Sequence, residues 1–100
     1  MKLRMIFDTW FVPPGRSAWV LYPFMFFRQH QYDVSDELLR HELEHVYQVH
    51  RHGWLKFYCS YIWCHFRYGY ADNPFEIEAR EAAKKGLTDF DYGCILRWVR

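Results

Sequence analysis

Two histidines four residues apart, His41 and His45, constrain the fold of this 100-residue chain more than any other feature. They enclose the segment HELEH, and residues four apart lie on the same face of a helix. Two imidazoles on one helix face can bind one metal ion, and Glu42 beside them can accept a proton from water. The pattern therefore calls for a helix at this position and predicts a zinc site with the chemistry of a peptidase.

Independent signals predict a helix over Asp36–His52. Asp33, Ser35 and Asp36 offer side-chain oxygens for an N-cap, and Gly53 suits the position after the last turn. Acidic residues stand in the first turn and basic residues in the last, as the helix dipole favours. Apolar residues recur between these ends at helical spacing: Leu38, Leu39, Val46 and Val49. The alternative is an accidental match on a polar helix, since a chain with six histidines meets the motif more easily by chance.

Length and composition narrow the class of protein. Residues 1–100 form one domain, and aromatic residues, 22% of the chain, let so short a chain bury a large area. The formal net charge is only +1, so the chain lacks the excess of positive charge that is typical of nucleic-acid-binding proteins. Three cysteines without a Cys-x-x-Cys pattern indicate neither a thiolate zinc site nor a full disulfide framework, which leaves a single bridge from Cys94 to Cys59 or Cys64 as the alternative. We find no signal-peptide pattern, and the apolar run Ala18–Phe27 is too short to span a bilayer, so a cytoplasmic or other intracellular location is predicted.

The remaining pattern predicts an α+β domain with a small N-terminal sheet or hairpin. Leu3–Val12 is apolar and fits a strand or a short helix, and a Pro-Pro-Gly turn follows it. Ala18–Gln29 is rich in aromatic and β-branched residues and predicts one strand, which Pro23 would place at a sheet edge or a bulge. Trp54–Tyr68 is apolar around most of its circumference, so it should be largely buried or cover a partner. Its length favours a helix over a strand.

A third helix is predicted to begin at Pro74, after a cap by Asp72 or Asn73. It should run to two lysines at 84 and 85 and end before Gly86. Residues 86–100 then form a tail whose structure the sequence leaves open.

A zinc ion held by His41 and His45 needs a further protein ligand and an open position for water. The metzincin pattern is excluded, because Gln48 and Arg51 stand where it requires Gly and His. His52 lies about 16 Å further along the axis than His41, at about 1.5 Å per residue, so it cannot reach the same ion. A carboxylate from a second helix is the remaining option.

The predicted third helix offers two such carboxylates, Glu76 and Glu78. Glu76 shares its face with Ala79 and Ala83, whose small side chains let another helix approach closely, so Glu76 is the favoured ligand. Its alternative role is a capping box with Asn73.

This combination resembles the gluzincin metallopeptidases, in which HExxH is followed by a helix bearing a Glu-x-x-Ala turn. The turn matches residues 76–79, with Arg80 where an Asp is common. Over about residues 18–85, the aromatic helix followed by the segment NPFEIEA is similar to the small single-domain members called minigluzincins. The resemblance implies a minimal zincin-like domain with one Zn²⁺ held by His41, His45 and Glu76. It also implies Glu42 as general base and then acid, and a peptide or protein as substrate.

Other features extend this hypothesis. A donor to the oxyanion is expected from one of four residues, and an extended substrate could pair with the predicted edge strand at 18–29. In some minigluzincins the C-terminal segment covers the cleft and keeps the protein latent; the tail here, with Asp89, Asp91 and Cys94, could do so or could complete the core. The four oxyanion candidates are Tyr68, Tyr70, His65 and Tyr92.

Two interpretations compete with an enzyme. One is a non-enzymatic zinc-stabilised interaction module. A fourth protein ligand would fill the last coordination position of its zinc ion, and its exposed aromatic residues would contact a partner. The other is a membrane-associated helix at Trp54–Tyr68, which rests on aromatic content alone.

Overall fold

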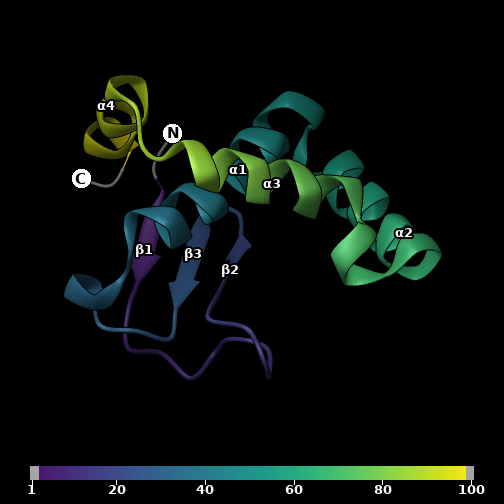
Figure 1. The fold of residues 1–100 in the computed structure, drawn as a ribbon, viewed down its shortest axis with the longest axis horizontal. Coiled ribbons are helices and arrows are strands. Elements are labelled where there is room, and N and C mark those ends of the chain that lie inside the picture. Colours follow the sequence, from purple (N-terminus) through teal and green to yellow (C-terminus); the bar gives the residue numbers. More distant parts are fainter. Residues whose placement is uncertain (1–2, 99–100) are drawn as a thin grey trace.

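The computed structural model describes residues 3–98, and it forms a small mixed α+β domain (Figure 1). Three short strands make one sheet, and four α-helices follow it in the described chain. The α+β prediction is confirmed. The elements are β1 (Arg4–Ile6), β2 (Ala18–Leu21), β3 (Phe24–Phe27), a 3₁₀ turn (Gln31–Asp33), α1 (Asp36–His52), α2 (Trp54–Asp72), α3 (Pro74–Lys85) and α4 (Asp89–Trp98).

The sheet has the order β1-β3-β2, with β1 parallel and β2 antiparallel to β3. The prediction of one strand over Ala18–Gln29 is wrong, because the segment folds back on itself between Leu21 and Phe24. Proline lacks an N–H and has a fixed φ, so Pro23 suits the turn between two strands better than a position within one. β2 nevertheless lies at an edge of the sheet.

One face of the sheet packs on α1. Alternate strand residues point toward the helix, among them Met25 and Phe27, and both are fully buried. Leu43 and Val46 of α1 complete the contact from above. These residues belong to one hydrophobic core, which fixes the sheet beneath the HELEH segment.

The aromatic helix α2 differs from its prediction in length and in burial. It continues past Tyr68 to Asp72, with a break in helical geometry at Gly69, whose φ of 82° favours glycine. We expected it to be largely buried or to cover a partner, and it is not largely buried, since Phe57 is its one fully buried residue. No helix of the described chain has both the length and the apolar character needed to cross a membrane.

The C-terminal segment forms α4, at the end of the molecule opposite α2 (Figure 1). Thr88 and Asp91 cap its start reciprocally: each side chain accepts a hydrogen bond from the other residue's N–H, at 3.2 and 2.9 Å. The buried Asp91 carboxylate also accepts from the Tyr47 hydroxyl at 2.7 Å and pairs with Arg40 at 3.3 Å. These contacts attach α4 to α1, and Ile95 packs against the core.

Replacing Asp91 by Asn should lower the free energy of unfolding by about 2 kcal/mol at neutral pH, because it removes the charge that Arg40 faces in a buried setting. The pKa of Asp91 is lowered, since hydrogen bonds from Tyr47 and Thr88 outweigh the opposing effect of burial. The stabilisation is therefore present above the ordinary Asp pKa of 3.8 and is lost as the pH falls through the lower folded pKa. Urea denaturation at several pH values measures this.

The matched control is Asp89→Asn, since Asp89 is exposed in the same first turn. It should cost less than about 1 kcal/mol. Equal losses for the two variants would contradict the role given to Asp91.

Candidate metal centre

Helix α1 presents three candidate residues from one turn. Its start is fixed by Ser35, whose hydroxyl accepts from the Leu38 N–H at 3.0 Å, and its end by Gly53, whose N–H donates to Val49 at 2.7 Å. The helix runs from Asp36 to His52, as the sequence predicts. The two histidines therefore share a face, and Glu42 follows the first of them.

Helix α3 brings Glu76 to the same place. Asn73 caps this helix, because its side-chain oxygen accepts from the Phe75 N–H at 3.0 Å, and Pro74 follows as predicted. The Asn73 amide also donates to the Tyr61 carbonyl at 3.2 Å, which ties α3 to α2. Ala79 on the same face is fully buried, so α3 lies close against α1.

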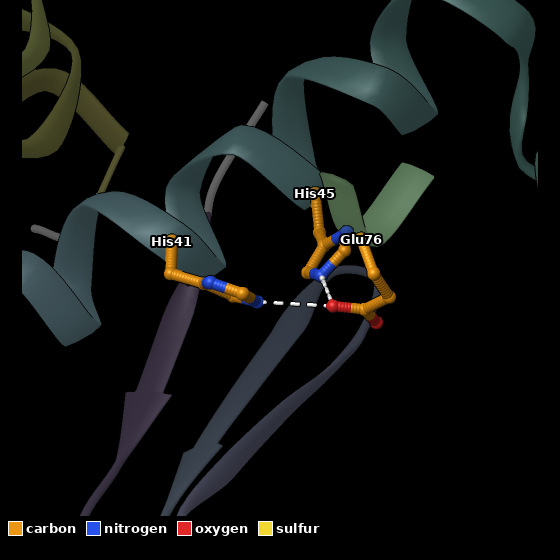
Figure 2. Close-up of side chains that lie close together, drawn as sticks. All are labelled: His41, His45 and Glu76. Atoms are coloured by element: carbon orange, nitrogen blue, oxygen red, sulfur yellow. Dashed lines mark hydrogen bonds and ion pairs between the residues drawn. The ribbon is translucent and has the colours of Figure 1, made fainter. Parts of the chain in front are cut away.

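Figure 2 shows His41 and His45 reaching down from α1 toward Glu76. Glu76 Oε1 lies 3.0 Å from His41 Nε2 and 3.3 Å from His45 Nε2. Glu76 and His45 are buried, and His41 is partly exposed. Glu78 points elsewhere, toward Gln48 and Arg51. Of the two candidate carboxylates, Glu76 is thus the one that lies against both histidines, and its side chain is not used in a capping box.

These three residues could hold a metal ion. One donor atom from each lies within 4.8 Å of the others. Nitrogen and carboxylate ligands bind zinc at about 2.0–2.2 Å, which puts the ligands of a tetrahedral site about 3.3 Å apart. The contacts of 3.0 and 3.3 Å are close to that spacing. In the described chain no fourth His, Cys, Asp or Glu joins the group.

Gln48 sets the orientation of the His45 ring. Its amide nitrogen donates to the Phe75 carbonyl at 3.0 Å and to Glu78 at 2.9 Å, so its oxygen is left to accept from His45 Nδ1 at 2.9 Å. With a metal bound at Nε2, this hydrogen bond would keep the proton of the neutral imidazole on Nδ1 and turn the Nε2 lone pair toward the cluster. Arg80, which stands where gluzincins commonly have an Asp, donates to the Ala71 carbonyl.

The second oxygen of Glu76 is also engaged. It accepts a short hydrogen bond from the Tyr61 hydroxyl, and Arg16 lies 3.7 Å away. Burial alone would raise the pKa of Glu76, but the hydrogen bonds from His41, His45 and Tyr61 hold it well below its ordinary value. The carboxylate is therefore ionised at neutral pH and available as a ligand.

Glu42 is buried beside the cluster without being part of it. Only 2% of the residue is exposed, and its Oε2 has no hydrogen-bond partner among the described residues. Burial raises the pKa of its carboxyl, although the nearby histidines act in the opposite direction. A buried carboxylate oxygen without a hydrogen-bond partner lowers the stability of the folded state. Glu42 is therefore a candidate for a functional residue.

Two cavities meet at Glu42 and Arg16, which line both. The larger, about 450 Å³, is bordered by His41, Tyr70 and charged residues of α3. The smaller, about 260 Å³, has a mainly apolar wall drawn from β2 and α2. The apolar wall consists of Trp19, Val20, Leu21, Phe57, Tyr58, Tyr61 and Ile62.

Among the four predicted oxyanion donors, the structure brings only Tyr70 to these cavities. The Arg16 guanidinium lies 4.6 Å from the centre of the Tyr70 ring. Tyr68, His65 and Tyr92 line neither cavity. Residues 86–95 of the tail line neither cavity, and residues 99–100 lie outside the described residues.

Sequence reasoning did not identify Gln48, Tyr61 or Arg16 as parts of the site. Gln48 follows His45 by three residues on a helix, and that spacing could have indicated their contact. Tyr61 and Arg16 come from distant segments and have no local signal.

No protein-family model, curated protein or solved structure matches this chain. The geometry of the site therefore carries the functional argument.

We expect the intact chain to bind about one zinc ion, and His45→Ala and Glu76→Ala each to abolish this binding, since each removes one of three protein ligands. Glu78→Ala is the matched control on the same helix. It should weaken binding by about tenfold, because Glu78 acts on the site only through Gln48. Titration calorimetry with zinc measures all three variants. A greater loss of zinc affinity in Glu78→Ala than in Glu76→Ala would show that Glu78 is the third ligand and that the assignment of Glu76 is wrong.

Proposed function

We propose that this chain is a zinc-dependent peptidase of the gluzincin type, with His41, His45 and Glu76 as ligands and Glu42 as the catalytic base. The observation that carries the proposal is the buried, unpartnered Oε2 of Glu42 beside a three-residue ligand cluster. A structural metal site has no need of such a group. A hydrolytic site does, because a base must take a proton from the attacking water.

The zinc ion would supply a Lewis acid that lowers the pKa of water and polarises the scissile carbonyl. Glu42 would take the proton from the attacking water and pass it to the leaving amine. Burial raises the pKa of Glu42, which is the direction that helps this carboxylate accept a proton from water. Tyr70, on the wall of the larger cavity, is the proposed donor to the oxyanion.

The two cavities support a peptide as the substrate. A chain laid from the larger cavity to the smaller would pass Glu42, and an apolar side chain would fit the smaller one. The edge strand β2 borders this path. Part of its edge is occupied, because the Tyr58 hydroxyl donates to the Val20 carbonyl at 3.2 Å and accepts from the Tyr22 N–H at 2.9 Å. A substrate strand pairing there would displace Tyr58.

A non-enzymatic zinc-stabilised module is the alternative function. Such a site is normally closed by four protein ligands. The cluster in the described chain offers three, which favours an open position and hence hydrolysis. The order of elements, with a small sheet, the HELEH helix and a Glu-bearing helix, is also what a minimal zincin-like domain requires.

Glu42→Gln should retain zinc with unchanged affinity and lower peptide hydrolysis by about 10²–10⁴-fold, because the amide cannot accept the proton. The assay uses the zinc-loaded full chain on a mixture of fluorogenic peptides. Glu81→Gln, an exposed change on α3, serves as the control and should leave the rate unchanged. Equal activity of Glu42→Gln and the intact chain would contradict the mechanism, and an intact zinc-loaded chain without activity would favour the interaction module.

A further inference from the structure

Helix α2 carries an exposed apolar stripe on its outer side, although Ile62 also borders the smaller cavity and Cys59 and Trp63 border a hollow beside Pro74 and Phe75. Its inner side is anchored by Phe57, Tyr58 and Tyr61, which contact the smaller cavity and α3. On the outer side, apolar residues follow one another at spacings of four, three, one and three residues, which keeps them on one face. This outer stripe consists of Leu55, Cys59, Ile62, Trp63 and Phe66.

All five residues of the outer stripe are exposed. The exposed fraction reaches 60% for Trp63 and 83% for Phe66. A buried aromatic side chain contributes more than any other kind to a stable core, so leaving two of the largest in water is unfavourable. Helix α2 occupies one end of the molecule, on the right of Figure 1. A contiguous exposed apolar patch of this kind marks an interaction surface.

The formal charges on α2 are mostly positive. Lys56 and Arg67 flank Trp63 at helical spacings of seven and four residues. Residues 54–71 contain no Asp or Glu, and Asp72 at the end of the helix is its one acidic residue, although the whole chain has a formal charge of only +1. A second copy of the chain would bring like charges together along the stripe. The surface is therefore complementary to an anionic partner.

We propose that α2 docks the protein on the surface of an anionic lipid bilayer. Tryptophan and tyrosine rings are favoured at the boundary between headgroups and acyl chains, where one end of the ring is apolar and the other wet. A helix with an apolar aromatic face flanked by cations lies in the plane of that boundary. The opposite side of α2 carries Tyr61, which points to the metal cluster, so the candidate site would stay on the aqueous side of the docked protein.

Co-sedimentation of the full chain with phosphatidylcholine vesicles, with and without phosphatidylserine, tests this proposal. Binding should require phosphatidylserine and fall as salt is raised, and Lys56→Glu with Arg67→Glu should weaken it by at least about tenfold. Trp63→Ala with Phe66→Ala should weaken it similarly. Trp10→Ala is the control, since Trp10 is 84% exposed but lies outside α2. Zinc binding and a thermal melt verify that each variant folds.

Binding that is equal with and without phosphatidylserine, or equally reduced by Trp10→Ala, would overturn the proposal. A folded chain that binds neither type of vesicle would also overturn it. If that chain instead formed a dimer that Trp63→Ala dissociates, the stripe would be assigned to self-association. These outcomes are independent of peptidase activity.

Discussion

The packing of the helices around the candidate metal centre depends on one buried carboxylate, that of Glu76. Glu76 is ionised in a position fully shielded from water, and an isolated charge there would be very unfavourable. Its two oxygens are matched by two histidines of α1 and a tyrosine of α2, with Arg16 from the loop before β2 nearby. Satisfying this charge therefore requires three helices and the loop before β2 to meet at one point. A divalent cation between the histidines and Glu76 would satisfy it more fully, which links the stability of the fold to the metal.

The elements that carry the ligands could be predicted because their signals are local. Ser35 and Gly53 delimit α1, and the Asn73-Pro74 pair starts α3, so both helices agree with their predicted bounds. The choice of Glu76 over Glu78 followed from the small residues on its face. In each case the deciding information lay within a few residues of the helix itself.

The failures have physical reasons as well. Pro23 was assigned to a strand, although its missing N–H suits the turn that it occupies. The helix α4 had a signal, the Thr88-x-x-Asp91 capping box, that the sequence reasoning did not use. The roles of Tyr61 and Arg16 could not be predicted, because they depend on how distant segments pack. The sequence could not decide whether α2 is buried within the chain or exposed, because the pattern of aromatic residues is the same in both cases.

We infer that the site holds zinc with three protein ligands and one open position. Zinc K-edge X-ray absorption on the zinc-loaded full chain measures this coordination. We expect a first shell of nitrogen and oxygen only, with two imidazoles at about 2.0–2.1 Å, one carboxylate, and one oxygen position that exchanges with an added hydroxamate. A sulfur scatterer near 2.3 Å, or a shell of four protein ligands unaffected by the hydroxamate, would contradict it.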